Sequence, residues 1–335
     1  MKHLSILILS LSLLLGVSSC KSDNPTESTP KPTAQKPRVK VPKFDGDKAY
    51  ALVEKQLSFG HRIPGTPEHK ATKDWYVEKL KAAGADVQEQ EFKASFLGLE
   101  DKESYNIIAS FNPKNTHRIM LAAHWDSRLI AEKDEDKSMQ EKPIMGADDG
   151  ATGTAILLEI ANMVKENPID LGIDIVLFDA EDQGDSNGAQ TTWCLGSQYW
   201  GKNPHVPNYK ATFGILLDMV GAKDAQFGLE GFSFANAGEI QKKIWGLARG
   251  MGYSDYFQNF KGGQITDDHY YVMTHRQFPM VDIINMPKDP TTGETSFGHY
   301  HHTHKDNIDI VSKRTLKVVG QVVTAVIYKE SDGSF

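Results

Sequence analysis

The stretch GIDIVLFDAED, residues 172–182, is a run of large apolar side chains that ends in acidic ones. A short apolar run of this kind is typical of a strand buried on both faces of a parallel sheet. Between it and an earlier run we expect a helix over 151–166, which opens with small residues. Alternating strands and helices predict an α/β fold of three layers, with a central mixed, largely parallel β-sheet flanked by helices. The other runs of this form are RIMLAAHWDS (118–127), ATFGILLDMVG (211–221) and FPMVDIIN (278–285).

Further elements are expected on either side of this series. Gly84 is expected to close a helix, because glycine readily adopts the left-handed conformation that ends many helices. No internal repeat and no low-complexity linker follows residue 43, so residues 44–335 are expected to form one domain. Apolar spacing predicts helices over 47–58, 66–83 and 312–329, and strands near 86–97 and 103–112.

The composition of the 335-residue chain suits a globular enzyme. Hydrophobic residues make up 39% of the chain and charged residues 24%, which is enough for one large core or two modest ones. The formal net charge is −7, which we interpret as a solvated acidic surface. Because no strongly basic run occurs, we expect no nucleic-acid partner.

The first 43 residues differ from the rest of the chain. Lys2 and His3 precede an apolar run that is shorter than the roughly 20 residues needed to span a bilayer. A positive start, a short apolar run and small residues before a cut predict a secretory signal peptide over residues 1–19. Residues 20–43 are rich in Pro, Ser, Thr and Lys, which predicts a flexible tether.

Cys20 follows small residues at the predicted cleavage site and resembles the lipobox of bacterial lipoproteins. The resemblance implies lipidation of Cys20 and a stable anchor in a lipid bilayer, since two or more acyl chains hold a protein firmly. We therefore expect a membrane lipoprotein of the bacterial cell envelope, facing the periplasm or in the outer membrane. The alternative is an ordinary signal peptide with a chance cysteine. Cys194, the other cysteine, is interpreted as a small buried side chain.

Acidic and imidazole side chains follow the ends of the predicted strands. Because the carboxyl ends of parallel strands meet at one edge of a sheet, these side chains are expected to converge there. In chain order they are His124 and Asp126, Asp148 and Asp149 in GADDGATG, Asp179, Glu181 and Asp182, Asp218, and His299, His301, His302 and His304.

This combination of side chains predicts a zinc site. Zn²⁺ accepts nitrogen and oxygen ligands in a tetrahedral arrangement, and a catalytic zinc keeps one position open. A site for Mg²⁺ would not need the histidines. Each piece alone has a plainer interpretation, because a strand-end aspartate often caps a loop and a histidine cluster can belong to a surface loop.

The segments HWDS, GADDGATG, LFDAED, LLDMVG, TDDH and HHTHKDN resemble, in order and spacing, the superfamily that holds the zinc aminopeptidases and the animal-type glutaminyl cyclases. The resemblance extends over about residues 50–325. It implies that residues 44–335 form a catalytic domain that converts the N-terminal glutamine of peptides and exported proteins to pyroglutamate, with release of ammonia.

The resemblance also implies a set of zinc ligands. Asp149 lies four residues before the glycine of ATG and matches the first ligand. Asp182 matches the second ligand, in a place usually held by glutamate. His302, from the pattern H-T-x-x-D-N, matches the third. The spacing alone does not choose between His301 and His302. For the cyclase reaction that the resemblance implies we expect one Zn²⁺ per chain, because no water needs to be activated.

Other matching residues receive catalytic and substrate-binding roles. Glu181 matches the general acid/base beside the metal. Asp218 and Asp267 match a pair of carboxylates that are joined by a hydrogen bond or a shared proton near the substrate amine. His301 stands where the animal cyclases have a tryptophan. Trp193 is either an aromatic wall for the substrate or a core residue.

Three functions remain open at this point. The first is the single-zinc cyclase, favoured by the likeness of LLDMVGA and ITDDHYYV to cyclase segments. The second is a two-zinc aminopeptidase, because His124 and Asp218 match positions that complete its ligand set with Asp149, Asp182 and His302. The third is a binding lipoprotein without catalysis, which the presence of Glu181 disfavours.

Overall fold

The computed structural model describes residues 38–335, so the predicted signal peptide, Cys20 and most of the predicted tether lie outside the described residues. Residues 38–45 have no regular structure. The remaining described residues pack around one large hydrophobic core. No helix within 38–335 has both the length and the apolar character needed to cross a bilayer.

The central sheet has six strands in the order β1-β2-β4-β3-β5-β8. The four strands β4, β3, β5 and β8 are parallel, and β2 and β1 add an antiparallel edge. This confirms the predicted mixed, largely parallel sheet. The strand bounds are β1 (Asp86–Phe96), β2 (Leu99–Phe111), β3 (Arg118–His124), β4 (Gly172–Phe178), β5 (Gly214–Asp218) and β8 (Met280–Ile284).

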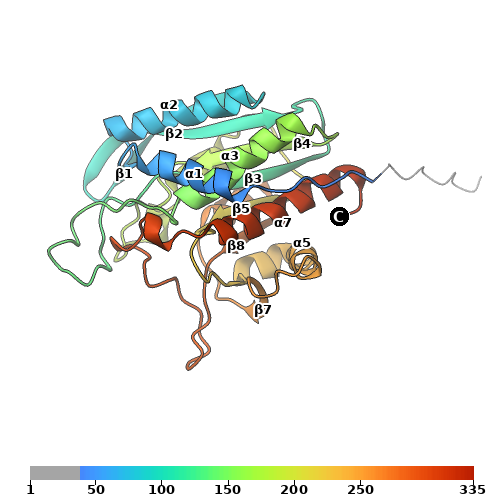
Figure 1. The fold of residues 1–335 in the computed structure, drawn as a ribbon. Helices are drawn as coiled ribbons and strands as arrows, with labels where there is room; N and C mark the ends of the chain where they lie inside the picture. The colour runs from blue at the N-terminus through green and yellow to red at the C-terminus, as the bar shows by residue number, and fades with distance from the viewer. Residues whose placement is uncertain (1–37) are drawn as a thin grey trace, which may run out of the picture. The chain divides into compact units, whose positions relative to one another are not determined.

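Helices cover this sheet. Figure 1 shows α1, α3 and α7 side by side across the sheet, with α2 next to them. The helices α4 and α6 pack against each other and contact strands of the sheet. Every residue of β4 and β5 is buried, so both faces of the central strands are covered. The helix bounds are α1 (Gly46–Leu57), α2 (Pro67–Ala82), α3 (Ala151–Glu166), α4 (Leu195–Lys202), α5 (Gly231–Gly250), α6 (Asp268–Arg276) and α7 (Lys313–Asp332).

Local sequence signals explain where several helices begin and end. Asp45 and Thr66 accept hydrogen bonds from backbone N–H groups at the starts of α1 and α2, and Pro67 opens α2. Ser312 does the same for α7. Gly84 has a φ of +89° just after α2, as expected for a residue that ends a helix.

The structure differs from the expectations at the β1–β2 hairpin and in the elements that were not predicted, one of which is α4. The β1–β2 hairpin turns at Leu97 and Gly98, so β2 begins at Leu99 instead of near residue 103. Pairing with β1 extends the strand through polar residues that an apolar pattern does not reveal. Between β5 and β8, a small parallel pair, β6 (Phe227–Leu229) and β7 (Phe257–Lys261), flanks α5, and α6 follows it. None of these elements was predicted, because their apolar spacing is weak and α5 is kinked at Ala237.

The register of the strands shows at which edge of the sheet the predicted site residues lie. His124 at the end of β3 pairs with Phe178 at the end of β4, and Asp218 at the end of β5 pairs with Ile284 at the end of β8. All four strands therefore finish at the same edge of the sheet. The residues directly beyond them are the ones that the sequence singled out.

Candidate active site

A pocket of about 440 Å³ opens at the carboxyl edge of the sheet. It is lined by every residue to which we assigned a zinc, catalytic or substrate role, apart from His124, which is buried. These residues are Asp149, Glu181, Asp182, Trp193, Asp218, Asp267, His301 and His302.

The three predicted zinc ligands come together from three different loops. Asp149 lies just before α3, Asp182 follows β4, and His302 lies in the loop after β8. The Nε2 atom of His302 is 3.0 Å from an Asp182 oxygen and 3.9 Å from an Asp149 oxygen. All three side chains are almost completely buried.

The donor set fits a metal cation. The Oδ2 atoms of Asp149 and Asp182 are buried and have no hydrogen-bond partner. Unpaired buried carboxylate oxygens are costly, and a bound cation would satisfy both of them. A soft site would need thiolates, whereas carboxylates with an imidazole suit zinc.

The neighbours of the two histidines distinguish His302 from His301 as a ligand. The Nδ1 atom of His302 lies 2.7 Å from a Glu132 oxygen, so this nitrogen donates and Nε2 keeps its lone pair for a metal. The Nδ1 atom of His301 lies 2.6 Å from the Lys133 ammonium, so in the neutral ring Nε2 carries the hydrogen. Burial lowers the pKa of His301 well below its usual range. The geometry therefore favours His302.

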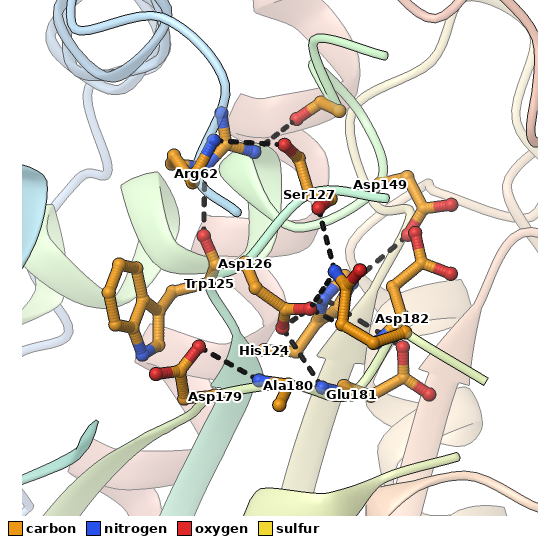
Figure 2. Close-up of polar contacts among 12 residues, drawn as sticks. Arg62, His124, Trp125, Asp126, Ser127, Asp149, Asp179, Ala180, Glu181 and Asp182 are labelled. Atoms are coloured by element: carbon orange, nitrogen blue, oxygen red, sulfur yellow. Dashed lines mark hydrogen bonds and ion pairs between the residues drawn. The ribbon is translucent and has the colours of Figure 1, made fainter. Parts of the chain in front are cut away.

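Two buried aspartates hold the backbone of the ligand loops. The Asp126 carboxylate accepts the N–H groups of Glu181 and Asp182 at 3.0 and 3.2 Å, as Figure 2 shows. The Asp306 carboxylate accepts the N–H groups of Asp148 and Asp149 at 2.7 and 3.2 Å. Asp182 and Asp149 are thus each fixed through their own peptide unit. Asp306 belongs to HHTHKDN, but nothing in the motif reveals this contact.

Arg62 ties the two ends of the long β3–α3 connection together. Its fully buried guanidinium donates to the carbonyl oxygens of Trp125 at 2.8 Å and of Met145 and Gly146 at 2.9 and 2.7 Å. Figure 2 shows the hydrogen bond from Arg62 to the Trp125 carbonyl oxygen, near the proposed ligands Asp149 and Asp182. No sequence pattern indicated this role, because Arg62 lies far from every motif.

Arg128 and Glu132 are further residues that the sequence did not single out. The Arg128 guanidinium donates to both Glu132 oxygens at 2.7 and 2.9 Å and to the backbone oxygen of Asp182 at 2.7 Å. It also lies 4.5 Å from the ring centre of Trp193. Through Glu132 it orients His302. Arg128 therefore links two of the zinc ligands to one wall of the pocket.

Aromatic rings form that wall. Trp193 is half-buried, lines the pocket and stacks on His302 with 5.8 Å between ring centres. Of the two interpretations of Trp193, its place in the structure favours the wall over the core. His301 stacks on His302 at 3.6 Å and on Phe297 at 4.3 Å, and it also faces the pocket.

Glu181 lies beside the metal ligands and close to Cys194. Burial raises the pKa of Glu181 well above its ordinary value of 4.5; the charge of His124 opposes this rise, and the charges of Asp267 and Asp182 add to it. A carboxyl group with a raised pKa is suited to accepting and returning a proton near neutral pH. Cys194 is buried, as predicted, and its thiol donates to Glu181 Oε1 at 3.2 Å.

Asp218 and Asp267 line the same pocket but have different neighbours. The Nε2 atom of His124 is 3.2 Å from Asp218 and 3.1 Å from Asp149, so the imidazole bridges these two carboxylates. Burial raises the pKa of Asp218 to about 8; the hydrogen bond from His124 opposes the rise and the charge of Asp267 adds to it. Asp267 directly precedes α6 and accepts the N–H of Asp268. The direct hydrogen bond expected between Asp218 and Asp267 is not among the contacts of the described residues.

Left-handed backbone conformations cluster around the site. Ala180, Cys194, Met219 and His302 have φ values between 47° and 58° although none is glycine. Each is a proposed ligand or lies beside one of the site residues Glu181, Trp193 and Asp218. Such conformations are uncommon outside glycine, and they persist where the surrounding structure fixes them.

The fold and the pocket define an α/β protein of the zinc exopeptidase type. The chain belongs to peptidase family M28, whose model matches residues 106–327. It is 47% identical to a Zn-dependent exopeptidase from Parabacteroides distasonis, with a TM-score of 0.83 over 86% of this chain and 99% of that one. It is 46% identical to Tannerella forsythia glutaminyl cyclase, with a TM-score of 0.82 over 86% of this chain and 99% of that one. Glutaminyl-peptide cyclotransferase of Gloydius blomhoffii is 24% identical, over 79% of this chain and 76% of the relative.

Proposed function

We propose that the chain is a zinc-dependent glutaminyl-peptide cyclotransferase, which closes the N-terminal glutamine of a peptide or protein into pyroglutamate and releases ammonia. The observation that carries this proposal is the arrangement of Glu181, Asp218 and Asp267 in one pocket with the proposed metal ligands Asp149, Asp182 and His302. The likeness to glutaminyl cyclases of known structure supports it.

The proposed metal is Zn²⁺, one per chain, held by Asp149, Asp182 and His302. When bound, zinc supplies a positive charge that polarises the γ-amide carbonyl of the substrate. The orphaned oxygens of Asp149 and Asp182 support this assignment.

We assign the proton transfers and the binding of the substrate to side chains of the pocket. Glu181 takes a proton from the α-amine as the amine nitrogen attacks the γ-carbonyl carbon. The same proton then passes from Glu181 to the γ-amide nitrogen, which leaves as ammonia when its bond to carbon breaks. Asp218 and Asp267 accept hydrogen bonds from the α-amine and hold it in place, and Trp193 and His301 flank the substrate. Because the nucleophile and the carbonyl belong to one residue, orientation provides much of the rate and no water is needed.

Substrate geometry gives a test of this reaction. A peptide that begins with glutamine should release ammonia in the presence of the zinc-loaded protein. A peptide that begins with asparagine should not, because its shorter side chain would have to close a strained four-membered ring. Ammonia from both peptides would indicate a general amidase and would contradict the proposal.

A two-zinc aminopeptidase is the second candidate. His124, Asp149 and Asp218 place one ligand atom each within 4.8 Å of one another, which is suitable for a second cation. The zinc exopeptidase of Parabacteroides distasonis is as similar to this chain as the cyclase of Tannerella forsythia. Two tightly held zinc ions per chain, together with release of free amino acids, would favour this candidate.

We further propose that the mature protein is anchored to a membrane of the bacterial cell envelope through acylated Cys20. The support is the signal-like sequence before Cys20 and the Pro/Ser/Thr-rich tether after it. Cys20→Ser should move the protein from the membrane fraction to the soluble fraction of the envelope. A variant that remains in the membrane fraction would contradict the anchor.

A further inference from the structure

Cys194 is a fully buried residue that contacts the proposed acid/base Glu181 but is not among the residues that line the pocket. It lies directly before α4. Its thiol donates a hydrogen bond to Glu181 Oε1 at 3.2 Å, and its backbone N–H donates to the Glu181 carbonyl oxygen at 2.9 Å. One residue outside the pocket therefore contacts both the side chain and the peptide unit of Glu181.

The start of α4 packs closely against the segment that carries Glu181. The N–H groups of Cys194, Leu195 and Gly196 donate to the carbonyl oxygens of residues 181, 180 and 179 at 2.9, 3.0 and 3.0 Å. These bonds satisfy N–H groups that have no partner within the helix. A Cβ atom at Gly196 would lie 2.3 Å from the Asp179 carbonyl oxygen, so the approach is as close as a glycine allows. Cys194 and Glu181 are therefore held at a fixed separation.

The backbone of Cys194 has a conformation that directs the thiol away from the helix. Its φ of 56° and ψ of 38° lie in the left-handed region, which is uncommon for a residue other than glycine. A residue directly before a helix often turns its side chain onto the first N–H groups, but Cys194 makes no such bond. Conformations of this kind persist where the surrounding structure fixes them. The thiol is thus free to bond to Glu181.

The two side-chain oxygens of Glu181 have different surroundings. Burial raises the pKa of Cys194 well above its usual range, and the charge of Glu181 raises it further, so the thiol keeps its hydrogen and donates it to Oε1. Oε2 accepts no hydrogen bond from the described residues. The Nδ1 atom of His124 is 3.9 Å from Oε2, which is beyond hydrogen-bond distance. Glu181 therefore has one oxygen that is held and one that is open.

We propose that Cys194 is a positioning residue whose thiol holds Oε1 of Glu181, so that Oε2 is the oxygen that transfers the proton. Oε2 takes one proton from the substrate α-amine and delivers the same proton to the γ-amide nitrogen, which leaves as ammonia. Cys194 acts through Glu181 and does not touch the substrate. The effect on proton transfer rests on the proposed cyclase function, whereas the hydrogen bond between the thiol and Glu181 does not.

Two substitutions test the role in catalysis. Cys194→Ala removes the donor, so kcat should fall by about 3–30-fold, while KM should change by less than about twofold because Cys194 lies outside the pocket. Cys194→Ser keeps a donor, so kcat should stay within about threefold of the wild type. Neither variant places a β-branched side chain at the left-handed position. The melting temperature and zinc content of each variant show whether it is folded and loaded.

Infrared spectroscopy detects the hydrogen bond itself. The S–H stretching band of a thiol lies where other protein groups do not absorb, and it moves to lower frequency when the thiol donates a hydrogen bond. Cys20 and Cys194 are the two cysteines of the sequence, so a Cys20→Ser background leaves Cys194 as the one thiol. In that background the band should move to higher frequency when Glu181→Ala removes the acceptor. An unchanged frequency would overturn the proposal.

The kinetic outcomes also decide the proposal. A folded, zinc-loaded alanine variant as active as the wild type would overturn it, as would a serine variant as impaired as the alanine variant. If the alanine variant does not fold, the serine variant must be active and the infrared shift must be present. The infrared comparison needs no substrate, so it tests the hydrogen bond whatever reaction the protein catalyses. A protein that shows the shift and releases no ammonia would contradict the cyclase function and leave the hydrogen bond in place.

Discussion

Glu181 and Asp182 are neighbours in the sequence with different proposed tasks. Asp182 reaches His302 and has an unpaired oxygen for a metal, whereas Glu181 contacts Cys194 and has a raised pKa. Glu181→Gln keeps the size of the side chain and removes its ability to transfer a proton. We expect kcat to fall by about 10²–10⁴-fold, while the zinc content stays unchanged. Steady-state kinetics and elemental analysis on the same sample check both parts, and an active variant would show that the acid/base is another residue.

Glu132 holds the proposed zinc ligand His302 in its orientation. Its carboxylate fixes the His302 tautomer at 2.7 Å, and loss of such a partner typically costs a site about 10–100-fold in metal affinity. Glu132→Ala should therefore weaken zinc binding by about this factor in a competition titration with a chelator. Glu135→Ala is the matched control, because Glu135 belongs to the same connection, is largely exposed and pairs with Lys305. Equal zinc affinities in the two variants would contradict the support role.

At the residue scale, the proposed zinc ligands could be predicted from the sequence, whereas the residues that support them could not. Asp149, Asp182 and His302 stand in short motifs, and the structure brings them together. Glu132 and Arg128 belong to a connection without regular structure, and they meet the site through the folded loop. No spacing rule relates residue 132 to residue 302, so contacts of this kind could not be predicted.

At the scale of elements, α3 packs unusually close to the sheet at Gly153, the glycine of the ATG motif. A Cβ atom there would lie 2.3 Å from the backbone oxygen of Leu217 and 2.9 Å from Ala123 Cβ. Gly153→Ala should therefore destabilise the protein by about 1–3 kcal/mol, since backbone cannot yield as a flexible side chain does. Gly246→Ala in α5 is the control, because nothing lies within 4 Å of its added Cβ. This control should be stabilising by up to about 1 kcal/mol. Denaturant unfolding of both variants measures the difference, and equal stabilities would contradict the packing argument.

Glu230 makes the N-terminus of α5 sensitive to acid. Burial opposes ionisation of Glu230, but hydrogen bonds from His269 and from the N–H groups of Ser233 and Phe232 lower its pKa from the ordinary 4.5 to about 2. A carboxyl group with a lowered folded-state pKa stabilises the fold above its unfolded-state value and loses that contribution as pH falls. The contribution at neutral pH is about 3 kcal/mol and should disappear between about pH 4.5 and pH 2.

Metal-free protein and its Glu230→Gln variant provide the measurement. The difference between their free energies of unfolding should be largest near pH 7 and should shrink as the pH is lowered through this range. A difference that does not change with pH would show that Glu230 stabilises α5 by some means other than its charge.

Elements of the core were easier to predict than elements around it. The strands β3, β4, β5 and β8 are buried on both faces, so their sequences are continuous apolar runs that can be recognised directly. The region that contains α5, β6, β7 and α6 packs at the margin of the sheet and has mixed polarity. Its structure depends on tertiary contacts such as the Glu230–His269 pair, which no local pattern reveals.

At the scale of the whole molecule, the pocket combines features of two reactions. The proposed metal ligands Asp149, Asp182 and His302 line the same cavity as Glu181, Asp218 and Asp267. A peptidase must activate a water molecule to cleave a peptide bond, whereas a cyclase uses the substrate's own amine. In the proposed cyclase reaction the three carboxyl groups act on that amine, so the chemical fate of a glutamine-initiated peptide is the central question.

The most direct test is mass spectrometry of a peptide that begins with glutamine, after incubation with the zinc-loaded protein. The cyclase reaction predicts an intact peptide lighter by one molecule of ammonia, a product that Glu181→Gln does not form. A peptide shortened by its first residue, with free glutamine in solution, would contradict the cyclase and identify the protein as an aminopeptidase.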